Sequence, residues 1–243
     1  MKTTVRLLCG VLFAALISGV SWAQEEDPEG TAEDIIAGIE ARNAARLNSR
    51  EAFDLGLAAM AAEDYSEAIS LFSTAAEGDA TQHLIFANLG LAYERSEIWV
   101  EAAEAYSEAQ TLLETMEEPP GGVNYFGSLT LVYAMAGDVD LALQNAEKGA
   151  EVDPEGAAQS FYNVGAILTN RGDLAGAAQA FERAIEVNPD IAEPYYQLAL
   201  ARFGNEATIP DAIPLLERYL ELMPEGPNLE AAQGLLDFAR QSQ

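Results

Sequence analysis

The chain has 243 residues and a formal net charge of −28, from 40 acidic and 12 basic side chains. Nucleic acid and anionic lipid both repel such a charge, so the composition excludes them as partners. The acidic residues are spread along the whole chain, which is typical of a surface that stays soluble in a salty exterior. The same charge would also attract basic partners, and both interpretations stay open.

The N-terminal segment, residues 1–23, has the layout of a secretory signal peptide. A basic head with Lys2 and Arg6 precedes an apolar run, which ends in small residues around Trp22. We expect cleavage after Ala23 and export to the periplasm, with no membrane insertion afterwards. Secretion and an uncleaved anchor are the alternatives, because residues 7–23 form a 17-residue run without charge, at the short end of what spans a bilayer.

Cleavage leaves a mature chain, residues 24–243, without cysteine, because Cys9 is the only one. The mature chain then forms no disulfide and is held together by packing alone. A chain of this length is long enough to bury a substantial core.

Residues 24–48 form an acidic segment followed by a predicted helix. Thr31 and Asp34 resemble a capping box, which would start a helix that runs through Leu47. The apolar side chains of this helix either pack on the next part of the chain or pair two chains. In the second case residues 31–47 are a homo-oligomer interface. The apolar residues are Ile35, Ile36 and Ile39.

From residue 49 onward the sequence repeats itself. Each repeat has a helix with a small, a large and a small residue at steps of four and three, which places all three on one face. The first of them recurs after 34, 40, 35 and 35 residues. The five trios are Ala68/Phe72/Ala75, Ala102/Tyr106/Ala109, Ala142/Ala146/Gly149, Ala177/Phe181/Ala184 and Ala212/Leu216/Tyr219.

Another helix precedes each trio, so that each repeat is a helix pair. Short turns such as Gly137-Asp138 and Gly172-Asp173 join the two helices, and glycine there can adopt the left-handed backbone that ends a helix. The single 40-residue spacing indicates a longer second helix that residues 119–122 stop late. The first helices are marked by a large residue followed by a small one, as in Leu55-Gly56, Leu89-Gly90 and Val164-Gly165.

The segment FYNVGAILTNRGDLAGAAQAFERAIEVNP resembles a tetratricopeptide repeat, in its period and in its aromatic, small and proline positions. The resemblance implies an all-α fold, a right-handed α-solenoid of about five helix-turn-helix repeats with a C-terminal capping helix. In such an array each helix pair buries its apolar face against the next pair. The repeats, numbered 1 to 5, are residues 49–82, 83–116, 123–156, 158–191 and 192–226, within a repeat region of 49–226.

Two repeats depart from the family pattern, and the chain ends in a predicted cap. Repeat 3 departs at Thr130 and Ala146, and repeat 5 has one extra residue in its Gly204–Pro210 turn. Residues 227–243 are expected to form the capping helix, which Asn228 starts.

Residues able to carry catalysis or bind a metal are scarce. His83 is the one histidine, so no paired-histidine metal motif exists, and we expect a surface or packing role for it. Neither a nucleophile elbow nor a glycine-rich phosphate loop occurs. Asp138 and Asp140 resemble the start of a calcium loop without its later ligands, which favours a helix start. We therefore expect no enzyme activity, no cofactor and no metal.

The family resemblance implies a concave groove lined by the first helix of each repeat, typically through positions 2, 5, 6, 9, 12 and 13. Leu57, Glu94, Ser128, Ala166 and Leu200 fall at such positions. The residues expected to bind a partner are Asp54, Asn88, Leu91, Arg95, Leu131, Tyr162, Asn163, Asn170, Tyr196 and Gln197.

Position 6 is polar in every repeat, which suits hydrogen bonds to the main chain of an extended peptide. The alternative is that these side chains only support neighbouring helices. The residues are Asp54, Asn88, Ser128, Asn163 and Gln197.

The candidate anchors are Tyr162 and Tyr196, at equivalent positions of repeats 4 and 5. The alternative for them is packing between repeats. Arg95 is the one cation of the groove, so the carboxylate clamp of chaperone-binding family members is not expected. Trp99 is expected in the core.

These observations predict a non-enzymatic scaffold that binds a protein or peptide segment in its groove. A self-associating or accessory component of a cell-envelope assembly is the alternative, using the helix of residues 31–47.

Overall fold

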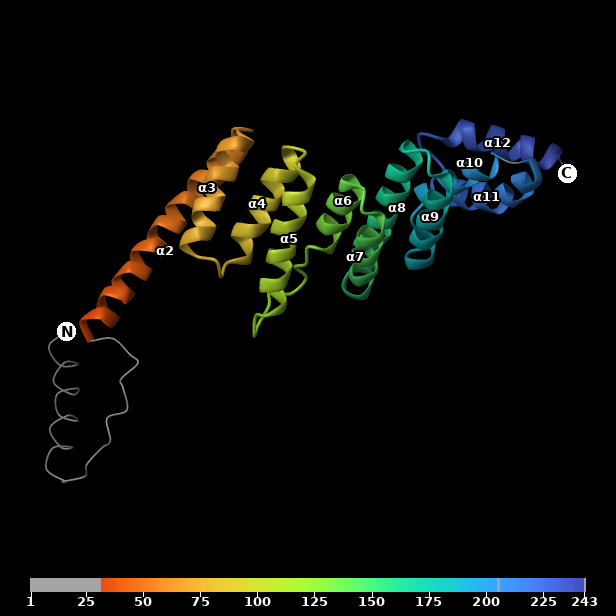
Figure 1. Cartoon of the computed structure of the whole chain (residues 1–243). Helices are drawn as coiled ribbons and strands as arrows, with labels where there is room; N and C mark the ends of the chain where they lie inside the picture. Colours follow the sequence, from red (N-terminus) through yellow and green to blue (C-terminus); the bar gives the residue numbers. More distant parts are fainter. Residues whose placement is uncertain (1–31, 205, 243) are drawn as a thin grey trace, which may run out of the picture. The chain divides into compact units, whose positions relative to one another are not determined.

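The computed structural model describes residues 32–204 and 206–242, and this part of the chain is built from helices without strands (Figure 1). The predictions for the signal peptide and the Thr31 cap concern residues that lie outside the described ones. No helix in the described ranges is long and apolar enough to cross a membrane. The elements are α2 (Ala32–Ala61), α3 (Tyr65–Gly78), α4 (His83–Arg95), α5 (Trp99–Glu114), α6 (Phe126–Ala136), α7 (Val139–Val152), α8 (Pro154–Asn170), α9 (Leu174–Val187), α10 (Glu193–Arg202), the 3₁₀ helix η1 (Glu206–Asp211), α11 (Ala212–Leu222) and α12 (Leu229–Gln241).

The chain falls into two compact units, Met1–Ala44 and Ala45–Gln243. Helix α2 begins in the first unit and ends in the second. In the first unit, Ile36 and Ile39 of α2 keep 55% and 46% of their surface exposed. The second unit contains the repeats.

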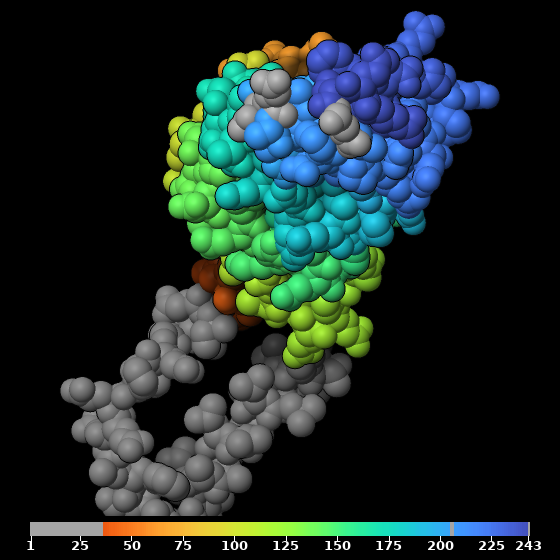
Figure 2. Space-filling view, turned by 90° about the vertical axis from the view of Figure 1, so that its right-hand side faces the viewer, coloured from red at the N-terminus to blue at the C-terminus, as the bar shows by residue number. Residues whose placement is uncertain are grey.

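The helices of the second unit form pairs in chain order, and each pair packs against the next (Figure 1). Within the pairs α4 packs on α5, α6 on α7, α8 on α9 and α10 on α11. Between pairs α3 contacts α4, α5 contacts α6, α7 contacts α8, and α9 contacts α10. Helix α12 packs along α11, and Figure 2 shows α10 to α12 in blue at the C-terminal end. The predicted all-α solenoid of helix pairs is confirmed.

The predicted small–large–small face of each second helix forms the core. Ala68, Phe72 and Ala75 of α3 have no exposed surface. The first helix of the same repeat crosses so close that a Cβ added at Gly56 would lie 2.6 Å from the Phe72 ring. Because no side chain fits there, the glycine of the large–small pattern is a requirement of this crossing.

The large residue of the same pattern packs on the repeat before it. Leu89 and Leu198 are buried in clusters with the second helices of repeats 1 and 4. Leu55 is 52% exposed, because α2 is the first helix of the second unit and no second helix precedes it there. Leu55 therefore matches the large–small sequence pattern but is not buried as Leu89 and Leu198 are.

The turn inside a repeat has the same left-handed backbone in four repeats, and the glycine prediction is confirmed in two of them. A left-handed residue other than glycine costs about 1 kcal/mol, which repeats 1 and 2 tolerate with glutamate. The φ angles are 58° at Glu63, 59° at Glu97, 97° at Gly137 and 83° at Gly172.

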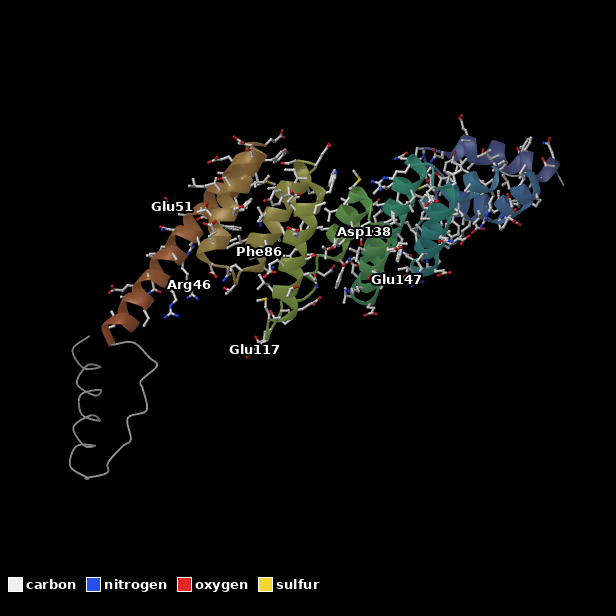
Figure 3. All side chains as sticks on the ribbon, in the orientation of Figure 1. Arg46, Glu51, Phe86, Glu117, Asp138 and Glu147 are labelled. Atoms are coloured by element: carbon white, nitrogen blue, oxygen red, sulfur yellow. The ribbon has the colours of Figure 1, made fainter. Side chains whose placement is uncertain are left out.

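The residue that follows this position caps the second helix. The Asp138 carboxylate, at the start of α7 (Figure 3), accepts a 3.1 Å hydrogen bond from the Leu141 amide, which confirms the predicted helix start. Asp64 and Asp173 make the same cap in repeats 1 and 4. Ile98 stands at this position in repeat 2 and makes no side-chain cap.

The prediction that a helix ends at Leu47 is wrong, because α2 runs unbroken to Ala61. No glycine or proline lies between Ile39 and Leu55, so this stretch contains no helix breaker. Ser49, where repeat 1 was expected to begin, is buried, and its hydroxyl donates a 2.7 Å hydrogen bond to the Ala75 carbonyl. The first helix of repeat 1 is therefore the end of a longer helix.

Two smaller expectations also need correction. Helix α5 is longer, as predicted, with 16 residues against 14 in α3, α7 and α9, but it ends at Glu114, before residues 119–122. Most of the extra length of repeat 2 therefore forms the loop of residues 115–125. Asn228 does precede α12, but its side chain makes no capping hydrogen bond.

Candidate partner-binding surface

The residues predicted to bind a partner all lie on the first helices of the repeats, α2, α4, α6, α8 and α10. Of these, α6 and α8 are in direct contact. Asp54, Arg95 and Asn170 are exposed. The others are half-buried, with one side against the helix array and the other in solvent: Asn88, Leu91, Leu131, Tyr162, Asn163, Tyr196 and Gln197.

Two members of the polar row already use part of their hydrogen-bonding capacity. The Asn88 side-chain amide donates to the Leu84 carbonyl at 2.8 Å, and the Asn163 carbonyl oxygen accepts from the Gln159 amide at 3.0 Å. These bonds stay within one helix, so they do not join neighbouring repeats. The side-chain carbonyl oxygen of Asn88 and the side-chain NH₂ group of Asn163 therefore stay available to a ligand.

The two candidate anchors have the same arrangement. The ring of Tyr162 packs on Phe181 at 5.8 Å between centroids, and that of Tyr196 packs on Tyr219 at 5.1 Å. Both contacts lie within one repeat. No hydrogen bond joins either hydroxyl to another of the described residues, and no buried polar atom among them lacks a partner. Each tyrosine therefore holds its ring in the array and its hydroxyl toward solvent.

The basic side chains of repeats 4 and 5 are mostly engaged away from the groove. The Arg183 guanidinium binds both carboxylate oxygens of Glu147, labelled on α7 in Figure 3, at 2.6 and 2.7 Å. These hydrogen bonds hold the pKa of the Glu147 carboxyl below its usual value. Arg202 and Arg218 pair with acidic residues at 2.7 and 2.8 Å. These ion pairs join one repeat to the next.

Tyrosines between repeats 2 and 3 use their hydroxyls inside the protein. Tyr106 donates to Glu94 at 2.9 Å, and its ring stacks on Tyr125 at 6.3 Å. The Tyr125 hydroxyl lies 2.7 Å from Nδ1 of His83. Burial raises the pKa of both phenols, so both stay protonated. His83 thus has the predicted packing role, and Glu94 is occupied.

Two cavities lie beside repeat 3. One, of 280 Å³, is partly open and lies between parts of α6, α7 and α8 and the loop before α6, around Gly127 and Asn145. The other, of 590 Å³, lies between the ends of α5 and α7 and the loop of residues 119–124, near Lys148. The described ranges contain no group of three or more histidine, cysteine or acidic residues able to hold a metal.

The fold defines a class of protein: a solenoid of stacked helix pairs with a period of about 34 residues. Family models agree, since one described as a tetratricopeptide repeat matches residues 53–117 and one described as a TPR repeat matches residues 165–205. The chain contains tetratricopeptide repeats within these two ranges.

Solved structures of this fold resemble the chain. A crystal structure of MamA protein has a TM-score of 0.57 at 18% identity, and covers 73% of this chain and 93% of its own. The structure of YrrB, described as a TPR protein with an unusual peptide-binding site, has a TM-score of 0.53 at 20% identity, and covers 84% and 100%. The comparison with curated proteins found no match.

Two residues that line the smaller cavity are not among those predicted from the sequence. Asn145 and Ser160 line it together with Gly127. The signal was present in the sequence, because repeat 3 has glycine at the position where Phe53 and Tyr162 stand in repeats 1 and 4.

Proposed function

We propose that the first helices of the repeats capture a peptide segment of a protein partner. The tetratricopeptide repeats make the chain a protein-interaction scaffold, and the proposal concerns how that scaffold binds. The description of YrrB as a peptide-binding TPR protein supports the same mode here.

The observation that carries the proposal is the pair Tyr162 and Tyr196. Their rings are held by packing on Phe181 and Tyr219, so they lose little freedom when a partner binds. Their hydroxyls have no partner among the described residues. Half-buried tyrosines of this kind are typical binding hot spots.

The polar row would set the register of the bound segment. Asn88 offers an acceptor and Asn163 a donor, the two groups that a peptide main chain needs. Each hydrogen bond would add about 0.5–1.5 kcal/mol. Arg95 is the one cation among the ten proposed residues, so the segment is bound through its main chain and apolar side chains rather than through a terminal carboxylate.

The proposal includes a non-enzymatic role and an exported, periplasmic location. The proposed location rests on the sequence of residues 1–23 alone.

The test is partner capture by a variant with Tyr162→Phe and Tyr196→Phe. Cross-linked pull-down from the producing cells identifies the partner, and its affinity is then measured by calorimetry. Loss of two hydroxyl hydrogen bonds should weaken binding by about 5- to 150-fold, at about 0.5–1.5 kcal/mol each. The packed rings remain, so helix content and unfolding midpoint should not change.

Tyr65→Phe is the matched control. Tyr65 starts the second helix α3, is half-buried, and has no hydrogen bond among the described residues. Its loss should leave the affinity unchanged. Unaltered affinity in the Tyr162 and Tyr196 variant would show that the groove model is wrong.

Self-association through residues 31–47 is the second candidate, favoured by the exposure of apolar side chains on α2. Ile36 is 55% exposed, Ile39 46% and Leu47 71%. An apolar side chain left in water on a helix start suits pairing with a second chain.

Sedimentation of the mature chain with and without residues 24–44 tests this candidate. The deletion stops at residue 44 because Ser49 and Ala52 are buried in the second unit. A dimer that the deletion converts to a monomer supports self-association, and a monomer in both cases rejects it.

A further inference from the structure

Repeats 1 and 4 fill the crossing of their two helices with a pair of aromatic rings. Phe53 and Phe72 lie 5.6 Å apart in repeat 1, and Tyr162 and Phe181 lie 5.8 Å apart in repeat 4. The two pairs occupy equivalent positions, the fifth residue of the repeat and the large residue of the trio.

Repeat 3 has neither ring. Gly127 stands at the position of Tyr162, and Ala146 at the position of Phe181. A Cβ added at Gly127 meets nothing nearer than the Ser160 hydroxyl, at 3.5 Å. The space that the Tyr162 ring fills in repeat 4 is therefore open in repeat 3.

The open space is the 280 Å³ cavity, here called the repeat-3 pocket. A cavity of about 150 Å³ is large enough to bind benzene, so the repeat-3 pocket has room for one aromatic side chain. Ser128 connects it to the groove, because it lines the pocket and also belongs to the polar row at position 6. The side chains and backbone around it are mainly small or polar: Asn124, Gly127, Ser128, Asn145, Ala146 and Ser160.

Two buried polar side chains face this space. Asn145 is 9% exposed and Ser160 is 8% exposed. Asn145 donates to the Leu141 carbonyl at 2.8 Å, and Ser160 donates to the Gly156 carbonyl at 2.9 Å. Each donates one hydrogen bond within its own helix and keeps a side-chain oxygen that can accept another.

We propose that the repeat-3 pocket receives a tyrosine side chain of the bound peptide. The inference rests on the proposed function and names the side chain that the groove selects. The ring takes the place that the Tyr162 ring fills in repeat 4. The phenol hydroxyl donates to the free oxygen of Asn145 or Ser160, which phenylalanine cannot do.

The first experiment uses p-cresol, the free side chain of tyrosine, and toluene, that of phenylalanine. Both are titrated into the mature chain and followed by ligand-observed NMR. We expect saturable p-cresol binding, with toluene weaker by about fivefold or more, since buried acceptors left unpaired are costly.

Two variants of Gly127 locate the binding. Gly127→Phe places a ring in the pocket, as Tyr162 does in repeat 4, and should weaken the binding of p-cresol by at least about tenfold. Gly127→Ala is the matched control, because its Cβ lies in ordinary contact with Ser160 and leaves the pocket open. Asn145→Leu together with Ser160→Ala should remove the preference for p-cresol over toluene. Absence of saturable p-cresol binding, or binding that Gly127→Phe leaves unchanged, overturns the inference.

The partner found by pull-down separates this inference from the proposed function. If Gly127→Phe weakens binding of the partner and Gly127→Ala does not, the repeat-3 pocket is part of the groove. If the Tyr162 and Tyr196 variant weakens binding of the partner and Gly127→Phe does not, the proposed groove is supported and the inference about the pocket is wrong. If none of these variants changes partner affinity, the groove fails as well, even where p-cresol binds.

Discussion

Repeats 3 and 4 are adjacent and have the same fold, but different interactions hold them together. Repeat 4 fills its helix crossing with Tyr162 and Phe181 over Gly165. Repeat 3 has glycine, alanine and the buried Thr130 at the equivalent positions. Two aromatic rings therefore fill the helix crossing of repeat 4, whereas the crossing of repeat 3 contains no such pair.

Polar contacts from repeat 4 replace part of what repeat 3 lacks. Arg171 donates to the Ala134 and Met135 carbonyls at the end of α6, at 2.8 and 2.9 Å. Arg183 binds Glu147 on α7. A repeat in a solenoid is stabilised by its neighbours as well as by its own core, so one repeat can carry a pocket without unfolding.

The largest effect is expected for Phe181→Ala in repeat 4. Phe181 is 2% exposed, and loss of a buried ring costs about 3–5 kcal/mol. At the equivalent position of repeat 3, Ala146→Gly should cost only about 1 kcal/mol. Urea unfolding followed by circular dichroism measures both. Similar losses at the two positions would contradict the difference in packing between these repeats.

The next effect is expected when repeat 3 is given the ring of repeat 4. Ala146→Phe alone should destabilise by about 1–3 kcal/mol, because Thr130 occupies the place of Gly165, where a Cβ would lie 2.5 Å from the Phe181 ring. Adding Thr130→Gly should recover part of this loss.

A double-mutant cycle of Ala146→Phe and Thr130→Gly measures the coupling. Thr130→Gly alone serves as the control and should be destabilising, since it removes a buried side chain from a helix. Strictly additive effects would mean that the two positions do not meet at this crossing.

The periodic part of this fold could be predicted from the sequence, because small and large residues recur at one helical face. Phe72 and Phe181 are identified by their spacing alone, and both are buried. The unbroken α2 could not be predicted so well. Ser49 begins the first repeat by pattern, but helix ends depend on breakers, and none occurs near it.

The candidate site was predictable only in part. Side chains that follow the family pattern, such as Tyr162 and Asn163, can be named from spacing. The repeat-3 pocket is a space between three helices, so it depends on how they pack in three dimensions. Ser160 on α8 and Gly127 on α6 both line it, although the whole of α7 separates them in the sequence. Comparing one repeat with the next gives the only sequence signal for it.

A smaller effect is expected for Arg171→Ala, which removes the hydrogen bonds from repeat 4 to the end of α6. The side chain is exposed, so we expect a loss of about 1–2 kcal/mol in the free energy of unfolding. Arg50→Ala, at an exposed position without such bonds, should change it by less than about 0.5 kcal/mol. Equal effects for both arginines would show that Arg171 does not support repeat 3.

The smallest effect concerns the Arg183–Glu147 ion pair and depends on pH. Both side chains are close to half exposed, at 39% and 47%, so Glu147→Gln should cost less than about 1 kcal/mol at pH 7. The folded pKa of Glu147 lies below the ordinary value of 4.5. The stabilisation is therefore present above pH 4.5 and is lost as the pH falls through the lower, folded pKa.

Unfolding of wild type and Glu147→Gln between pH 3 and 7 should thus show curves that converge only at the acidic end. Glu151→Gln, on the same helix without an ion pair, should run parallel to wild type over this range. If the difference in unfolding free energy between wild type and Glu147→Gln grew on acidification, the folded pKa of Glu147 would be raised rather than lowered. Repeat 4 would then not stabilise repeat 3 through this ion pair.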